Sequence, residues 1–232
     1  MLKKTLAAIA ACTIISVSAD ARTVTLDEGS FRLSIAGKEV GTETFSIRQS
    51  GAGEGAVIIA VGRVVLDGSG RAQELSSELQ VGGRSLRPAA YEVRVQGNGA
   101  ERITGRVVGS RFSAQIVSAA GESMREYLAG DGAVLADEGV AHHYYFLAKR
   151  LDAGATRIPI IIPRQNRQVT AQVSAAGSER IAVAGQSIDA RKINVAPAGG
   201  TARTVWVDAE GRVLRLEIPG SDIVAQRVQA PK

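Results

Sequence analysis

The feature that most constrains the fold is a period-two alternation of apolar and polar residues, interrupted repeatedly by glycine. Phe31, Leu33 and Ile35, for example, alternate with Arg32 and Ser34. Such alternation is typical of a strand that buries one face, and glycine clusters between the runs are typical of tight turns. The glycine-rich turns lie at 51–55, 67–70, 82–83, 97–99, 130–132 and 208–211. This pattern predicts a meander of antiparallel hairpins.

The expected strands are too many for a flat sheet. After the first hairpin, strands are predicted at 56–66, 91–95, 102–108, 112–117, 124–128, 157–162, 168–173, 188–195, 204–207, 212–218 and 223–228. The run at 56–66 is apolar enough to suggest cover on both faces. A sheet of roughly 12 or more strands must curl into a barrel or half-barrel to bury its apolar face. We therefore expect a mainly β protein with a single, highly curved antiparallel sheet.

One segment, 137–152, has a different period. Its apolar residues recur at the three- and four-residue spacing of an amphipathic helix. They are Val140, Tyr144, Leu147, Ala148 and Leu151. Asp137 is expected to cap the start of this helix and Gly154 to end it.

The first 21 residues have the layout of a secretory signal peptide. Lys3 and Lys4 form a basic start, and residues 5–17 are apolar and uncharged. Ala19 and Ala21 then supply the small residues of a cleavage site. The apolar stretch is shorter than the roughly 20 residues needed to span a bilayer. We therefore expect export, with residues 1–21 removed.

The expected mature chain, 22–232, forms one all-β domain in the periplasm, without a transmembrane segment. A second interpretation keeps Cys12, because residues 9–12 resemble a lipobox whose cysteine would carry a lipid anchor. Apolar Ile14 and Ile15 continue past that cysteine, where a lipoprotein normally has a polar tether. This favours cleavage after residue 21.

Composition and motifs argue against most catalytic and nucleic-acid-binding classes. A single cysteine in the chain rules out a disulfide framework or a thiolate metal cluster. The 28 basic residues fall singly along the expected strands, which indicates a solvated face rather than a nucleic-acid surface. Phosphate-binding loops, nucleophile elbows and zinc motifs are missing from the sequence. We expect no enzymatic activity, no cofactor, no metal and no nucleic-acid partner.

The two histidines leave one alternative open. His142 and His143 are adjacent, so their side chains point in different directions and make a poor chelating pair. A structural role is the expectation for both. In the alternative, His143 acts with Asp137 or Glu138, directly or through a metal.

Aromatic residues are scarce, at 4% of the chain, yet several gather near the expected helix. Two interpretations remain open. In the first, these residues seal the core between helix and sheet. In the second, they line an apolar ligand groove on the concave side of the sheet, as in small ligand-binding barrels. The predicted groove residues are Tyr144, Tyr145, Phe146, Leu147, Leu151 and Trp206.

Short motifs along the chain form a recognisable set. They are the alternating pair of strands from Phe31 to Thr42 through Gly37 and Gly41, Leu86-Arg87-Pro88 with Tyr91, Leu135 with Asp137, the segment 159–163 bounded by prolines, and Val205-Trp206-Val207-Asp208 with Gly211-Arg212. The set resembles a family of Gram-negative periplasmic proteins of unknown function. The resemblance implies a curved antiparallel sheet, similar in shape to the lipoprotein-localisation carriers that shield acyl chains. It further implies a role in envelope biogenesis or lipid handling, and it implies no catalytic residues.

The sequence thus predicts a non-enzymatic periplasmic protein that binds or carries a hydrophobic lipid or acyl ligand in cell-envelope biogenesis. The alternative is a structural module that docks an envelope protein through a sheet edge or helix contacts.

Overall fold

The computed structural model describes residues 23–67, 72–130 and 132–232. The expected signal peptide, 1–21, and the lipobox cysteine Cys12 lie outside these residues. All described strands belong to one sheet of 15 strands, in the order β8-β7-β6-β5-β4-β3-β2-β1-β15-β14-β13-β12-β11-β10-β9. The prediction of a mainly β protein with one curved sheet is confirmed.

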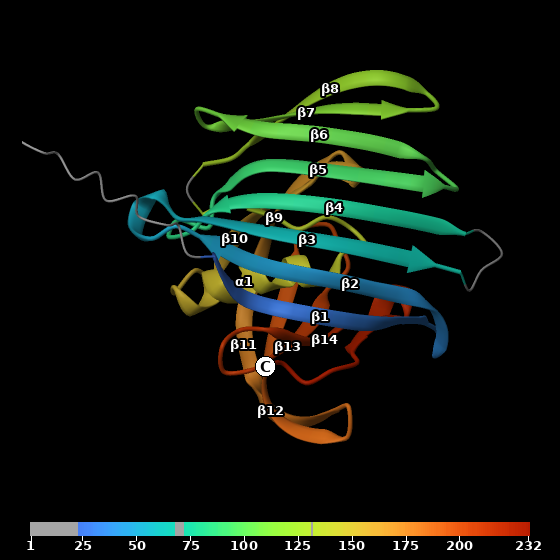
Figure 1. Cartoon of the computed structure of the whole chain (residues 1–232), viewed down its shortest axis with the longest axis vertical. Coiled ribbons are helices and arrows are strands. Elements are labelled where there is room, and N and C mark those ends of the chain that lie inside the picture. The colour runs from blue at the N-terminus through green and yellow to red at the C-terminus, as the bar shows by residue number, and fades with distance from the viewer. Residues whose placement is uncertain (1–22, 68–71, 131) are drawn as a thin grey trace, which may run out of the picture.

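The strands are β1 (Thr23–Ile35), β2 (Lys38–Ser50), β3 (Val57–Leu66), β4 (Gln73–Gly82), β5 (Pro88–Gly97), β6 (Glu101–Val108), β7 (Arg111–Ser118), β8 (Gly121–Leu128), β9 (Val134–Leu135), β10 (Arg157–Ile162), β11 (Arg167–Val183), β12 (Gln186–Pro197), β13 (Arg203–Val207), β14 (Val213–Ile218) and β15 (Ile223–Arg227). Neighbouring strands pair antiparallel, except β9 and β10, which are parallel. The sheet bends strongly, so that β1 to β8 form one wall and β11 to β14 cross behind it (Figure 1).

The apolar run at 56–66 forms β3, but only one face of this strand is covered. Ile58 and Val64 are buried, whereas Val57 and Val61 are 37% and 44% exposed. The expectation of cover on both faces is wrong, because the sheet is a single layer whose outer face meets solvent. Apolar content alone did not reveal this, since valine suits both faces of a strand.

The helix in the structure is shorter than the predicted range, 137–152. The α-helix, α1 (Tyr144–Asp152), follows a 3-10 turn, η2 (Ala141–His143). The other short 3-10 turns are η1 (Gly53–Gly55), η3 (Pro163–Gln165) and η4 (Pro219–Ser221). In α1 every residue from Tyr144 to Ala148 is buried, so the helix is covered on all sides rather than along one stripe. It fills the interior of the curved sheet. Among the described residues, no helix is long and apolar enough to cross a membrane.

The prediction that Asp137 caps this helix is wrong. The residue before α1 is His143, whose side chain makes no capping hydrogen bond. Asp137 lies upstream of η2. The first N–H groups of the helical segment are instead bonded by Glu43 of β2, whose carboxylate accepts hydrogen bonds from the backbone of Ala141 and His142 at 2.8 and 3.0 Å. A carboxylate suits this place because the first N–H groups of a helical segment lack partners within it.

The edge strand β8 contacts the opposite part of the sheet, at the start of β11, through side-chain hydrogen bonds rather than a backbone ladder. Gln168 of β11 accepts a hydrogen bond from the backbone N–H of Leu128 at 2.9 Å and donates one to its carbonyl at 2.6 Å. The Tyr127 hydroxyl donates to Asn166 at 3.2 Å. These contacts hold the wall formed by β1 to β8 against the strands that cross behind it, so the curved sheet resembles a barrel.

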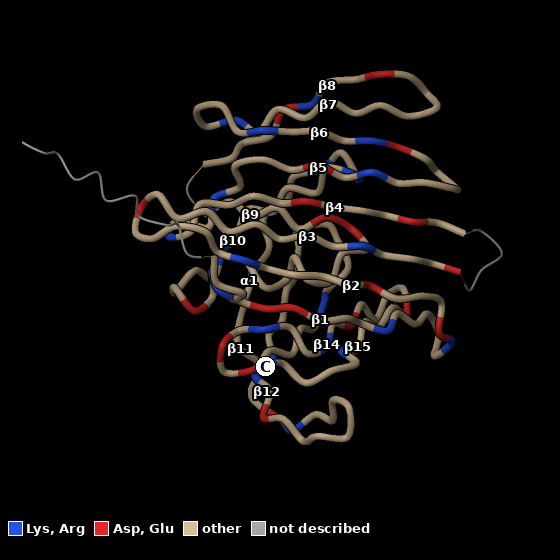
Figure 2. The backbone as a smooth tube through the Cα atoms, in the orientation of Figure 1, with Lys and Arg blue, Asp and Glu red and all other residues tan. Residues whose placement is uncertain are grey.

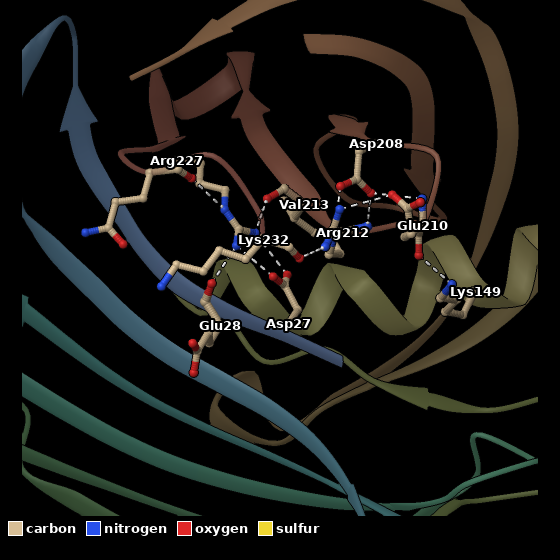
Figure 3. Close-up of polar contacts among 10 residues, drawn as sticks. Asp27, Glu28, Lys149, Asp208, Glu210, Arg212, Val213, Arg227 and Lys232 are labelled. Atoms are coloured by element: carbon tan, nitrogen blue, oxygen red, sulfur yellow. Dashed lines mark hydrogen bonds and ion pairs between the residues drawn. The ribbon is translucent and has the colours of Figure 1, made fainter. Parts of the chain in front are cut away.

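The first and last strands along the chain, β1 and β15, are neighbours in the sheet and are held together by a buried ion pair. Arg227 of β15 is almost completely buried, and its guanidinium donates to both carboxylate oxygens of Asp27 in β1, at 2.7 and 3.0 Å. The backbone carbonyls of Glu28, Val213 and Gln229 accept its other hydrogen bonds (Figure 3). Every nitrogen of this guanidinium is therefore bonded, as a buried arginine requires.

Charged residues are spread over the outer face of the sheet. Basic and acidic residues are interspersed along the strands rather than gathered in one region (Figure 2). Several pair across neighbouring strands, for example Arg63 with Glu74 at 2.7 Å and Arg102 with Glu92 at 2.9 Å. This distribution agrees with the solvated face expected from the sequence.

Candidate functional site

The candidate site is an apolar pocket of about 130 Å³ at one end of the curved sheet. Most of its lining comes from three parts of the chain: the β1–β3 region, the β14–β15 hairpin, and the segment that leads into α1. Ile162 of β10 and Arg203 of β13 complete it. Strand pairing places the β1–β2 and β14–β15 hairpins at the same end of the sheet, because Ile223 lies opposite both Ile35 and Ile218. The apolar lining consists of Leu33, Ile35, Val40, Val64, Leu66, Ala136, Val140, Ala141, Tyr144, Ile162, Leu216, Ile218, Ile223 and Ala225.

The pocket has a buried floor and a more exposed rim. Val64, Val140 and Leu216 are each less than 5% exposed, whereas Ile35 is 44% exposed. Ile218 is half-buried. An apolar group would therefore enter past the hairpin ends and lie against the residues on the floor.

Of the six predicted groove residues, the structure places Tyr144 in the pocket lining. Phe146 and Leu147 are fully buried among core residues, and Leu151 packs partly buried against the same core. The ring of Tyr145 meets Phe146 edge to face, with centroids 5.5 Å apart. These four residues fill space between helix and sheet, as in the first interpretation of the aromatic cluster.

Trp206 lies on the other side of the sheet from α1. Its neighbours Val205 and Val207 face the main core, so alternation along β13 turns the indole outward. There it forms a small separate cluster with Val183, Ala190 and Leu214. The indole N–H donates a hydrogen bond to Glu179. The structure thus separates Trp206 from residues 144–146.

Polar side chains gather beside the pocket floor. Glu43 is fully buried, and its carboxylate lies 2.6 Å from Nδ1 of His142 in addition to accepting the two backbone bonds described above. The His142 ring stacks on Phe45, with centroids 5.5 Å apart. The carboxylate therefore positions both the start of the helical segment and an imidazole.

Asp137 is a second buried carboxylate in this region. Its Oδ2 accepts a hydrogen bond from the Tyr91 hydroxyl at 2.9 Å, and its Oδ1 accepts from the backbone N–H groups of Glu138 and Arg164. Burial raises the pKa of Asp137 to about 6, although these hydrogen bonds oppose the rise. Burial also raises the pKa of Tyr91 well above its usual value.

His143 contacts the backbone of Asp137 rather than its carboxylate. Nδ1 of the imidazole accepts a hydrogen bond from the Asp137 N–H at 3.2 Å, so the proton of the neutral ring resides on Nε2. Burial lowers the pKa of His143 well below its usual range, and the neighbouring His142 lowers it further. Glu138 is exposed and bonded to Gln165. The histidine–carboxylate pair of the enzymatic alternative is therefore not formed in this arrangement.

Two further polar atoms beside this cluster are buried and have no hydrogen-bond partner in the described part of the chain. They are Nε2 of His142 and Nε2 of His143. Groups of three or more histidine, cysteine, aspartate or glutamate side chains placed to hold a metal are not found in the described ranges.

Sequence reasoning missed Glu43, Tyr91 and Arg203 as residues of the site. For Glu43 a signal was present, because it falls in phase with the apolar residues Phe45 and Ile47 of β2. A carboxylate on the buried face of a strand needs a partner, and a strand pattern does not say which one.

Comparisons with known proteins bear on the fold. No protein-family model matches the sequence. No curated protein matches it either. Among solved structures, the crystal structure of a β-barrel-like protein of the domain of unknown function DUF1849, from Brucella abortus, superposes with a TM-score of 0.60.

The chain has a β-barrel-like fold. The superposition covers 90% of this chain and 98% of the Brucella protein, at 11% sequence identity. It supports the resemblance to an uncharacterised domain of unknown function with a β fold. At this level of identity the likeness is one of fold.

Proposed function

We propose that this protein is a non-enzymatic binding protein or carrier of the periplasm, and that it holds a hydrophobic lipid or acyl ligand in the pocket beside α1. The observation that carries the proposal is the pocket itself: it stays open and apolar although α1 and its aromatic residues fill the rest of the sheet's interior. Curved sheets that enclose an apolar space commonly hold a small hydrophobic ligand. Export, indicated by the pattern of residues 1–21, supports a role in the cell envelope.

The size of the pocket restricts the ligand. An engineered apolar cavity of about 150 Å³ holds a benzene molecule, whereas pockets for drug-sized ligands occupy about 300–1,000 Å³. The 130 Å³ of this pocket therefore suits one end of a single acyl chain.

The alternative, docking of an envelope protein by strand addition, has a candidate edge in β8. This strand is exposed on both faces along most of its length, and Met124 and Leu128 are 57% and 61% exposed. It also carries Glu122, Arg125 and Glu126, and charged side chains are a common device against pairing at sheet edges. Because its charged residues discourage strand addition, β8 is a weaker candidate for the functional site than the pocket is.

Filling the pocket tests the proposal. Ala225 of β15 lines the pocket and is buried, so the longer side chain of Ala225→Leu would occupy the ligand's space. We expect the variant to bind a fluorescent fatty acid about tenfold more weakly, equivalent to about 1.4 kcal/mol. The matched control is Ala182→Leu on the exposed face of β11. Affinity is measured by fluorescence titration, and folding of both variants by circular dichroism.

Two outcomes would contradict the proposal. One is a folded wild-type protein that binds no fatty acid probe and carries no lipid by mass spectrometry. The other is an Ala225→Leu variant that binds the probe as tightly as the wild type and the control do.

A further inference from the structure

We propose that the pocket recognises an anionic headgroup through Arg203, and that its ligand is a single-chain amphiphile with a terminal carboxylate. The inference rests on the proposed function and specifies the chemistry of the ligand. It is carried by an arginine that lines an apolar pocket and has no acidic partner among the residues that the structure describes.

Arg203 is the first residue of β13 and points into the molecule. It is in phase with Val205 and Val207, which are buried in the main core, and it belongs to the pocket lining. In the next strand, Glu217 lies opposite Thr204, so Ile218 at the rim is close to Arg203 along the sheet. The guanidinium is therefore placed near the rim, where the headgroup of an inserted chain would lie.

The hydrogen bonds of Arg203 are incomplete. Nη1 donates to the carbonyl of Thr201 at 2.9 Å. Nε is buried and has no hydrogen-bond partner among the described residues. A buried guanidinium N–H without an acceptor is unfavourable, and a carboxylate is the acceptor that matches its planar donors best. Arg227 shows the usual arrangement in the same protein, with all of its nitrogens bonded.

The acidic residues of the pocket already have partners. Glu43 accepts from two backbone N–H groups and contacts His142, and Asp137 accepts from Tyr91 and two backbone N–H groups. Glu138 is bonded to Gln165 and reaches solvent. Among the charged side chains in the described lining, Arg203 is the one with an unsatisfied hydrogen-bonding atom, and its charge is positive. A carboxylate complements it, whereas a cationic headgroup does not.

Tyr144 supplies a second donor. It lines the same pocket, and burial raises the pKa of its hydroxyl to about 12, while the positive charge of Arg203 opposes the rise. The hydroxyl is therefore protonated at neutral pH and can donate a hydrogen bond to an anion. Together the two side chains can bind a carboxylate at the rim, with the chain lying against Val64 and Leu216.

Three amphiphiles with the same chain and different headgroups test the inference: decanoate, decanol and decyltrimethylammonium. At neutral pH we expect the wild type to bind decanoate about tenfold or more tightly than decanol, and the cationic amphiphile most weakly. The Arg203→Gln variant should lose this preference while keeping its affinity for decanol. Arg203→Lys should retain part of it, because the charge remains and the planar donor set is lost.

Arg94→Gln on the exposed face of β5 is the matched control, because it removes the same charge away from the pocket. Tyr144→Phe should weaken decanoate about threefold to tenfold and leave decanol unchanged. Affinities are measured by isothermal titration calorimetry. Arg203→Gln should fold at least as stably as the wild type, since it removes an unsatisfied buried group.

The outcomes separate this inference from the proposed function. If decanoate and decanol bind with equal affinity and Arg203→Gln changes neither, the headgroup assignment is overturned and the apolar site stands. A preference for decyltrimethylammonium would also overturn the assignment, in favour of the pocket carboxylates. If the folded wild type binds none of the three, the proposed function fails as well.

Discussion

At the scale of single residues, the site is distinguished by ionisable groups whose pKa values burial shifts toward the neutral form. His143 and Asp137 both have shifted pKa values, the first lowered well below 6.5 and the second raised to about 6. Both shifts have desolvation as their main cause, because a low-dielectric interior disfavours the charged form of either group. Their effects on stability have opposite signs.

Below pH 6.5 the unfolded state protonates at His143 before the folded state does, so the free energy of unfolding falls as the pH drops. Between the ordinary pKa of 3.8 and about 6, the folded state retains a proton on Asp137 that the unfolded state loses, so the free energy of unfolding falls as the pH rises. The free energy of unfolding of the wild type, plotted against pH, therefore contains both slopes.

Replacing His143 should therefore change how steeply the free energy of unfolding depends on pH, and not only its magnitude. The His143→Phe variant should lose up to about 1.4 kcal/mol per pH unit of acid sensitivity below pH 6.5. Asp137→Asn should remove the opposite slope between about pH 4 and 6. Urea denaturation at a series of pH values measures both. Profiles parallel to that of the wild type, with a constant offset, would show that these groups keep their ordinary pKa values.

At the scale of secondary structure, α1 and η2 fill the concave side of the sheet, and the strands beneath them are shaped to fit. Gly62 of β3 lies directly under His142: a Cβ atom at this glycine would be 2.3 Å from Cε1 of the imidazole. The glycine is therefore needed for close approach and not for a turn. In the sequence, Gly62 interrupts an apolar run with no local reason. The reason is His142, which lies 80 positions further along the chain.

The Gly62→Ala variant should destabilise the fold by about 1–3 kcal/mol, the usual cost of inserting a methyl group into a filled space. In a His142→Ala background the same change should cost only a few tenths of a kcal/mol, because the ring is gone. Gly55→Ala is the control, since nothing lies within 4 Å of its Cβ position. Urea denaturation of the wild type, the two single variants and the double variant gives the coupling energy. Equal costs in both backgrounds would contradict the packing argument.

At the scale of the whole molecule, the pairing of β1 with β15 brings the first and last strands along the chain together in the middle of the sheet. The Asp27–Arg227 ion pair crosses this seam between residues 200 positions apart, and both side chains are buried (Figure 3). A buried pair is most costly when only one partner is removed, because the other charge is left in the interior.

Asp27→Asn should accordingly reduce the free energy of unfolding by about 3–5 kcal/mol. The double variant Asp27→Leu/Arg227→Met should be less destabilised than the sum of its single variants. The exposed pair Arg180–Asp189 provides the comparison: Asp189→Asn should change the free energy of unfolding very little, because solvent screens an exposed pair. Chemical denaturation in urea measures all of these. A cost for Asp27→Asn as small as that for Asp189→Asn would show that the seam does not depend on this pair.

The sequence by itself determined most of the strands, the curvature of their single sheet and the presence of one helix, because these follow from local periods of two and about four residues and from the number of strands. Only the tertiary structure decided where the helix begins, which face of β13 carries Trp206, and that Glu43 rather than Asp137 bonds the first N–H groups of the helical segment. It also decided that Arg203 and Tyr144 share one pocket. Each of these depends on contacts between distant parts of the chain, and such contacts leave no periodic signal in the sequence around either partner.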